Sequence, residues 1–469
     1  MVIKIEFLTQ KKHIFFWLTL LIIGLSQTSC KKKDFFSSSN LSFSNDTIVF
    51  DTIFTTIGST TKQFKIYNTQ NSKIKIESIQ LMGGSNSPFR INVDGISGLQ
   101  FGETVLDKKD SLYVFVDVTL QVNNGTLPLI IEDSIRFRTN GKDQYVKLAV
   151  WGQDAYFHYK DLNSGTWQND KPHVIYGYAA VDSAETLTIP GGTNIYLHKN
   201  AQLINYKGTL NMNGSLGNEI TLQGDRLESM YSDVTGQYYG IYFYEARPSQ
   251  LNYVNIKNGT SGIHLYSRDA SQTGYTLTLT NSKIENCASY GLFIYSGAKV
   301  KAENCIISKN GYHALFVLEG GDFNMNHCHL LGYQNGSNQT PAVGISNFYY
   351  NPNTSITTVA SINEGSITNS VIYGNQSGEI AFDTLATGGV TLNFNLKNNV
   401  IKMDSPSTSS IFLNTIWNAN PLFTNISESN YKFPANSPLN AAGFSTSVSL
   451  DILGMGRNNP PDIGAYELN

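Results

Sequence analysis

The sequence predicts an all-β protein in which a small β-sandwich precedes a parallel β-solenoid. Apolar and polar residues alternate in many short stretches, as they do along strands. No helical 3.6-residue pattern of useful length occurs beyond the N-terminus. From about residue 180 onward one short segment recurs, twice at a spacing of 23 residues. Only 15% of the 469 residues are charged and the net charge is −3, so no basic tract indicates a nucleic-acid partner.

The N-terminus has the pattern of a secretory signal, which we assign to residues 1–30. Lys11 and Lys12 precede an apolar run at residues 14–25, which is shorter than the roughly 20 residues of a membrane span. Small residues then lead directly to Cys30, and this ending resembles a bacterial lipoprotein signal. The resemblance implies a lipid on Cys30 and a cell-envelope protein anchored to the outer membrane, on a face that the sequence does not define. The alternatives are an ordinary cleaved signal and an uncleaved anchor.

Residues 31–40 resemble the flexible tether of such lipoproteins, and residues 41–152 have the strand pattern of a β-sandwich. About seven short alternating strands are recognisable there, which is typical of an immunoglobulin-like fold. Asn140 and Gly141 join two of them as a hairpin turn. Because this region contains no catalytic cluster, we interpret it as a spacer or packing partner.

One asparagine position marks the repeat in the second half of the chain. It is occupied by Asn281, Asn304, Asn369 and Asn398, with His327 as a substitute. Stacked coils lie about 4.8 Å apart, so equivalent residues form ladders along the axis. We expect these asparagines to bond to one another and to turn backbone, which is a structural role.

This pattern resembles the right-handed parallel β-helix proteins of the pectate-lyase-like superfamily, over residues 156–469. The stretch at residues 187–225 resembles their first coils. The ending, with DIGAYE from Asp462 to Glu467, resembles a terminating segment of secreted bacterial β-helices. We therefore expect a cap at about residues 420–469 on the open end of the solenoid, with Asp462 and Glu467 in structural roles.

Aromatic side chains mark the outward face of one strand in four successive coils. Alternation places two columns side by side on this face, and both end abruptly after the fourth coil. Their aromatic members are Tyr242, Tyr244, His264, Tyr266, Phe293, Tyr295 and Phe316. Such rings can stack on the C–H faces of sugars, and relatives of this fold commonly bind polysaccharides on such a sheet. The alternative is a structural or adhesive protein whose columns are covered by the sandwich or by the insert at residues 347–358.

A lyase or glycoside hydrolase acting in the same groove is the enzymatic alternative. A lyase would use Arg226 or Arg268 as its base and Asp225, Asp233 or Asp269 as Ca²⁺ ligands. A hydrolase would need neighbouring carboxylates. No compact cluster of acids or of Lys and Arg recurs from coil to coil, so the sequence favours binding over catalysis.

The remaining candidate sites are interpreted as structural. Cys287, Cys305 and Cys328 are expected to be buried free thiols, with a bridge between the last two as the alternative. His327 and His329 share a strand face, but no third ligand is evident, so no metal site is assigned. Outside the lyase alternative the sequence indicates no cofactor, and we expect a monomer.

Overall fold

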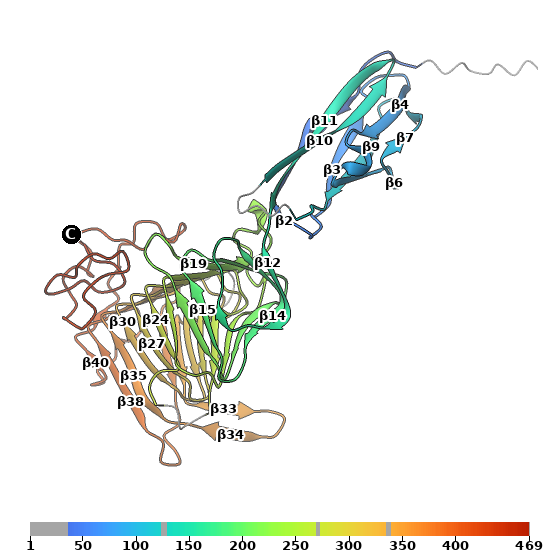
Figure 1. Ribbon diagram of the computed structural model, residues 1–469. Helices are drawn as coiled ribbons and strands as arrows, with labels where there is room; N and C mark the ends of the chain where they lie inside the picture. The colour runs from blue at the N-terminus through green and yellow to red at the C-terminus, as the bar shows by residue number, and fades with distance from the viewer. Residues whose placement is uncertain (1–35, 123–128, 269–272, 334–338, 469) are drawn as a thin grey trace, which may run out of the picture. The chain divides into compact units, whose positions relative to one another are not determined.

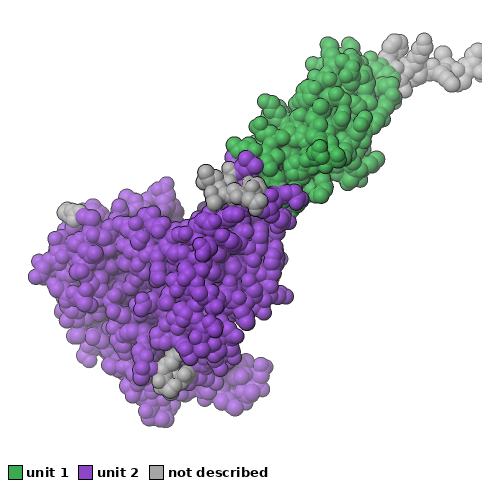
Figure 2. All heavy atoms as spheres, viewed as in Figure 1, with its two compact units in different colours: residues 1–50, 58–120, 130–150 green, residues 51–57, 121–129, 151–469 purple. Residues whose placement is uncertain are grey.

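The computed structural model describes residues 36–122, 129–268, 273–333 and 339–468. These residues form two compact units (Figure 2). Of the described residues, the first unit comprises 36–50, 58–120 and 130–150, and the second comprises 51–57, 121–122, 129 and those from 151 onward. Regular structure is almost entirely β in the described ranges, apart from the short 3₁₀ turns η1 (Gly84–Asn86) and η2 (Ser229–Tyr231). None of the described residues belongs to a helix long and apolar enough to cross a membrane.

The first unit is a β-sandwich of two sheets with antiparallel pairing. Phe137 of one sheet contacts Phe43 and Phe64 of the other, with ring centroids 5.0 and 6.2 Å away. One sheet has the order β1 (Ser42–Phe43), β3 (Lys62–Tyr67), β9 (Ser111–Val118), β5 (Phe89–Val93), β6 (Ile96–Gly98). The other has the order β2 (Thr47–Phe54), β11 (Lys142–Gln153), β10 (Leu129–Thr139), β4 (Ile74–Leu81), β7 (Gln100–Phe101), with β8 (Thr104–Leu106) paired to β4.

The second unit is a parallel β-solenoid, which confirms the predicted architecture. Each coil contributes one strand to each of three series, and each strand pairs in parallel with its equivalent one coil further on. We call the series the aromatic, middle and flank sheets, in the order in which the chain visits them. Strands of the middle sheet stand side by side in Figure 1.

The bounds of these strands are as follows. The aromatic sheet contains β14 (His173–Val181), β17 (Gln202–Tyr206), β20 (Gly240–Tyr244), β23 (Ile263–Tyr266), β26 (Leu292–Tyr295), β29 (Leu315–Leu318), β32 (Val343–Ser346) and β37 (Ile380–Asp383), and β12 (Tyr156–Leu162) pairs with β14. The middle sheet contains β13 (Gly165–Thr166), β15 (Thr186–Pro190), β18 (Thr209–Asn213), β21 (Ser249–Asn252), β24 (Leu277–Thr280), β27 (Lys299–Glu303), β30 (Asp322–Asn326), β35 (Ile362–Thr368), β38 (Leu392–Lys397) and β40 (Phe412–Leu413). The flank sheet contains β16 (Asn194–Leu197), β19 (Ile220–Gly224), β22 (Val254–Lys257), β25 (Lys283–Glu285), β28 (Ile306–Ser308), β31 (His329–Gly332), β36 (Val371–Gly374), β39 (Val400–Ile401) and β41 (Ile416–Trp417).

Inward side chains of all three sheets form one continuous apolar core. Strand β23 shows the pattern, because Ile263 and Leu265 are fully buried while His264 and Tyr266 point outward and are half-buried. Cys287, Cys305 and Cys328 are free and buried, as expected. The thiols of Cys305 and Cys328 donate weakly to backbone carbonyls of their own coils.

The asparagine ladder lies at the corner between the middle and flank sheets. Asn304 donates to the Asn281 Oδ1 atom over 3.1 Å, and Asn369 bonds the ring of His327 over 3.0 Å. Asn281, Asn304, His327 and Asn369 all have φ between 46° and 54°. Asparagine adopts this left-handed conformation more readily than most residues, which explains its recurrence.

The C-terminal segment packs along the flank sheet, and this corrects the prediction of a cap on the open end. Tyr431, Leu439 and Ile463 share a buried cluster with Ile306 and Val371, which point outward from β28 and β36. The segment also bonds successive asparagines of the ladder through its backbone. It therefore covers an apolar side of the solenoid that would otherwise face water.

Candidate functional site

The two outward columns of the aromatic sheet have the register that the sequence predicted. Tyr242 lies opposite His264, which lies opposite Phe293, and Phe293 lies opposite Phe316. In the second column Tyr244, Tyr266, Tyr295 and Leu318 follow one another. The columns also begin one coil earlier than expected, with Ile204 opposite Tyr242 and Tyr206 opposite Tyr244.

Some rings within each column stack on their neighbours, whereas Tyr242 and His264 are tilted by 50° and Tyr266 and Tyr295 by 56°. Tyr206 and Tyr244 are 5.4 Å apart with planes 9° from parallel, and Tyr244 and Tyr266 are 5.2 Å apart at 15°. In the first column Phe293 stacks on His264 at 4.6 Å and on Phe316 at 5.4 Å. Offset stacking of this kind stabilises the packing of successive coils in the solenoid. It also covers ring faces, so stacked members present mainly edges and hydroxyl groups outward.

A third row of rings, which the sequence analysis missed, borders the first column. Tyr290 stacks on Phe316 at 5.2 Å, and His313 also stacks on Phe316, at 4.7 Å. The hydroxyl group of Tyr239 is 2.8 Å from the Nδ1 atom of His264. The available signal was spacing, because Tyr239, Tyr290 and His313 each precede a first-column ring by three residues.

A hollow of about 560 Å³ opens at the start of the columns, and we call it the first hollow. It forms where the ring column begins, because Ile204 occupies the place of a ring one coil before Tyr242. Its lining consists of Asn200, Gln202, Ile204, Tyr206, Tyr239, Tyr242, Tyr244 and His264.

A second hollow of about 290 Å³ lies where the columns end. Gly344 follows Phe316 in the first column, and the His313 ring, which stacks on Phe316, lies over this glycine. The insert named as a cover in the alternative interpretation forms a hairpin, β33 (Phe348–Asn351) and β34 (Ile356–Val359), which projects from the solenoid in Figure 1. Tyr349 of this hairpin lines the second hollow and contacts the edge of Tyr295 at 6.3 Å. The hairpin thus borders one end of the columns, and Tyr242 to Phe316 remain half-buried.

His264 is held neutral at the centre of this surface. Burial lowers its pKa to about 4, because a charged imidazole would lose its hydration there. Burial likewise raises the pKa of Tyr242 to about 12. The first hollow is therefore lined by uncharged side chains at neutral pH.

A polar edge follows the second column, at the corner between the aromatic and middle sheets. The Arg268 guanidinium donates to the Glu319 carboxylate over 2.9 Å and to the Ser296 hydroxyl over 2.7 Å. The backbone N–H of Arg268 donates to Glu245 over 3.0 Å. The guanidinium also lies 5.8 Å from the ring centre of Tyr266. This edge places two carboxylates and one cation beside the tyrosines.

The proposed lyase residues do not converge on one place. Asp225 bonds His198 over 2.7 Å, and Arg226 is paired with Glu228 in the loop that leads into β20. Arg268 follows the end of β23. Strands of a parallel sheet all start at one edge and end at the other, so Arg226 and Arg268 lie at opposite edges.

Asp233 is not at this surface either. Asp233 lines a separate groove of about 760 Å³ between the flank sheet and residues 426–429. Asp269 lies outside the described residues, as does the proposed lipidation site Cys30. Burial raises the pKa of Asp225, although its bond to His198 opposes the shift.

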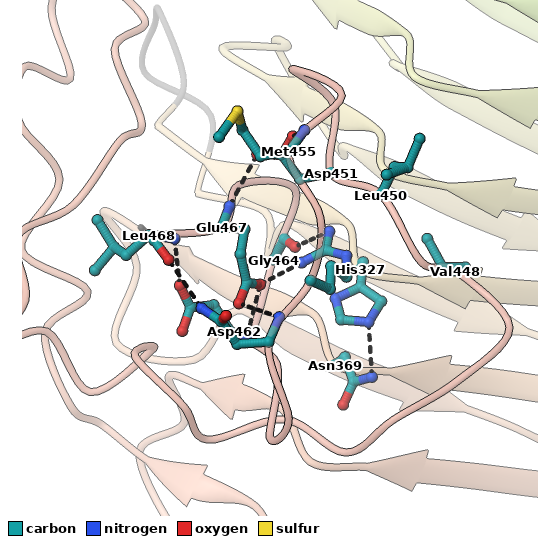
Figure 3. A network of polar contacts seen from close by, with 12 residues as sticks. His327, Asn369, Val448, Leu450, Asp451, Met455, Asp462, Gly464, Glu467 and Leu468 are labelled. Atoms are coloured by element: carbon teal, nitrogen blue, oxygen red, sulfur yellow. Dashed lines mark hydrogen bonds and ion pairs between the residues drawn. The ribbon is translucent and has the colours of Figure 1, made fainter.

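Asp462 and Glu467 hold the C-terminal segment together, which confirms their structural interpretation (Figure 3). Glu467 is fully buried, accepts from the backbone N–H of Asp462 and pairs with Arg457 over 3.2 Å. Asp462 accepts from the N–H groups of Ala441 and Leu468.

His327 and His329 are engaged in packing. His327 belongs to the asparagine ladder, and His329 is buried beneath the C-terminal segment, 5.8 Å from the ring of Tyr466. In the described part of the chain no group of three or more His, Cys, Asp or Glu side chains is arranged to hold a metal.

Comparisons with known proteins agree with the solenoid. Residues 185–330 match the model of the family described as "Right handed beta helix region". The solenoid is a right-handed parallel β-helix in an all-β chain. No curated protein matches the sequence.

Two solved structures resemble parts of the chain weakly. One is a family 123 glycoside hydrolase from Clostridium perfringens, 10% identical over 26% of this chain and 30% of its own, with a TM-score of 0.18. The other is a PapD-like domain of human CEP192, 13% identical over 27% of this chain and 95% of its own, with a TM-score of 0.17. At these scores neither resemblance carries a functional argument.

Proposed function

We propose that this protein is a lipid-anchored cell-envelope protein whose β-helix binds a glycan on the aromatic sheet. The observation that carries the proposal is the pair of outward aromatic columns, held in register over four coils and flanked by a hollow at each end. A half-exposed surface of rings this large on a secreted protein needs a partner. The lipid on Cys30 would hold it at the outer membrane as a monomer.

The chemistry of the surface fits carbohydrate better than protein or nucleic acid. Sugars present apolar C–H faces and rims of hydroxyl groups, and this surface combines rings with tyrosine hydroxyls. The hydroxyl groups of Tyr206, Tyr244, Tyr266 and Tyr295 recur with the spacing of the coils, about 4.8 Å. A repeating polymer lying along the axis would meet the same group at every step.

A glycan array probed with the lipid-free chain, residues 36–469, tests this proposal. The double variant Tyr266→Ala, Tyr295→Ala should lose retention of every glycan that the wild type binds. Tyr145→Ala is the control, because Tyr145 is 48% exposed and belongs to the sandwich, not to the columns. If the double variant retained glycans as well as the wild type does and had the same circular dichroism, the proposal that the columns bind glycan would be refuted.

Polysaccharide cleavage is the second candidate function. The polar edge favours it, because the Arg268 side chain pairs with Glu319 and its backbone contacts Glu245, all beside Tyr266. A glycan bound on the columns would pass this edge. Incubation of bound polysaccharides with the wild type and with Glu319→Gln, followed by assays for unsaturated products and new reducing ends, decides the matter. Product from the wild type alone would make the protein an enzyme.

A further inference from the structure

The first hollow is lined by Tyr242, a half-buried ring that stacks on none of its ring neighbours. Tyr242 meets its ring neighbours Tyr239, Tyr244 and His264 at 79°, 58° and 50°, so none of them lies parallel to it. Ile204 precedes it in the column and brings no ring against it. Further along, Phe293 lies between near-parallel neighbours on both sides, which leaves its faces covered.

The polar groups of the first hollow are amides and hydroxyls. Asn200 and Gln202 lie on its lining, and Gln202 shares an outward row with Ile204 on β17. These side chains donate and accept hydrogen bonds without carrying charge. The Nε2 atom of His264 is buried and has no hydrogen-bond partner within the described structure. One ring face, two amides and several tyrosine hydroxyls therefore surround a space large enough for a sugar residue.

The charges nearest to the hollow do not create an anion site. Lys207 lies beside the lining residue Tyr206, with its Nζ atom 5.4 Å from the ring centre. The polar edge further along contributes Glu245 and Glu319 together with Arg268. An acidic polysaccharide would pass these carboxylates, whereas the lining of the first hollow consists of uncharged side chains that suit a neutral sugar.

We propose that the first hollow is the principal sugar-binding subsite and that its ligand is a neutral glycan. One sugar residue packs on the exposed face of Tyr242, and its hydroxyl groups bond the amides of Asn200 and Gln202. The chain then runs along the columns, which contribute hydroxyl groups more than ring faces. This inference rests on the proposed glycan-binding function and makes it specific in place and in ligand class.

Affinity electrophoresis of the lipid-free chain in gels containing galactomannan, β-glucan or polygalacturonate tests the inference. Tyr242→Ala should weaken binding of the neutral polymer by about tenfold or more, and Gln202→Ala by about fivefold. Tyr242→Phe should keep most of the affinity, because it retains the ring. Phe316→Ala is the matched control at the opposite end, and its effect should be smaller than that of Tyr242→Ala.

The outcomes separate this inference from the function on which it rests. If no glycan on the array binds the wild type, the proposed function fails. If a glycan binds and Tyr242→Ala keeps full affinity while Phe316→Ala or the double tyrosine variant loses it, the function stands and the first hollow is not its main subsite. Tight binding of polygalacturonate that weakens steeply with salt would overturn the neutral ligand class. A melting curve for each variant separates lost binding from lost folding.

Discussion

Replacing Asn304 tests the ladder that keeps the coils in register. Its amide donates to Asn281 over 3.1 Å and to the Leu450 carbonyl over 2.8 Å, and its oxygen accepts from Arg457 over 2.8 Å. Its φ is 54°, in the left-handed region. One side chain therefore connects neighbouring coils, the C-terminal segment and a buried guanidinium.

Two substitutions separate the hydrogen bonds of Asn304 from its backbone conformation. Asn304→Gly keeps the left-handed turn and loses three bonds, one of them to a charged group. At about 1 kcal/mol for each neutral bond and about 2 kcal/mol for the charged one, the free energy of unfolding should fall by roughly 4 kcal/mol. Asn304→Ala should lose a further 1–2 kcal/mol or so, because alanine is strained at positive φ.

Urea unfolding followed by intrinsic fluorescence, with hydrogen exchange of the C-terminal segment, measures both effects. Asn281→Gly and Asn281→Ala are the matched pair, because Asn281 bonds Asn252 and Asn304 but not Arg457. Asn281→Gly should therefore lower the free energy of unfolding by less than Asn304→Gly does. Equal stability of the glycine and alanine variants would refute the conformational explanation. A glycine variant as stable as the wild type would refute the ladder itself.

Three further predictions follow from buried or chemically distinctive residues. Burial lowers the pKa of His329 to about 3 in the folded chain, compared with about 6.5 in the unfolded chain. As the pH falls through this range, the imidazole is protonated in the unfolded chain but not in the folded one, which favours unfolding. Stability should therefore decline between pH 6.5 and 3, and His329→Leu should flatten that slope in urea titrations. Gly464→Ala should loosen the C-terminal segment, seen as faster proteolysis, because a Cβ atom there would overlap the His329 ring and φ is 101°. Labelled palmitate should enter the wild type in a bacterial host but not Cys30→Ala, and incorporation by the variant would end the lipoprotein proposal.

The repeat and the columns were predictable because both follow from pairing geometry. In a solenoid, a residue and its equivalent one coil later are hydrogen-bonded neighbours, so sequence alignment of the coils is also spatial alignment. This is why Tyr244, Tyr266 and Tyr295 could be placed in one column from spacing alone. Asn281 and Asn304 carry a second signal, since a left-handed corner selects asparagine.

The ring orientations and the place of the C-terminal segment were not predictable in this way. Whether Tyr244 and Tyr266 lie parallel or tilted depends on side-chain rotamers, which the register does not set. The contact of Asn304 with Arg457 joins residues 153 positions apart and follows no repeat. The apolar outward face of the flank sheet, with Ile306 and Val371, was the available sign that something packs there rather than on the end.

The stacking that stabilises the coils also limits where this surface can recognise a ligand. A ring between two parallel neighbours contributes to stability but offers only its edge, so a longer column adds little stacking area for a sugar. Space for a sugar residue opens where the columns begin and end, in the first hollow beside Tyr242 and in the second hollow beyond Phe316. These places are five coil steps apart, from Ile204 to Gly344, or about 24 Å at about 4.8 Å per step. Binding should therefore strengthen with glycan length until the chain spans both hollows and level off beyond it, whereas faces exposed all along the columns would give affinity that rises evenly with length.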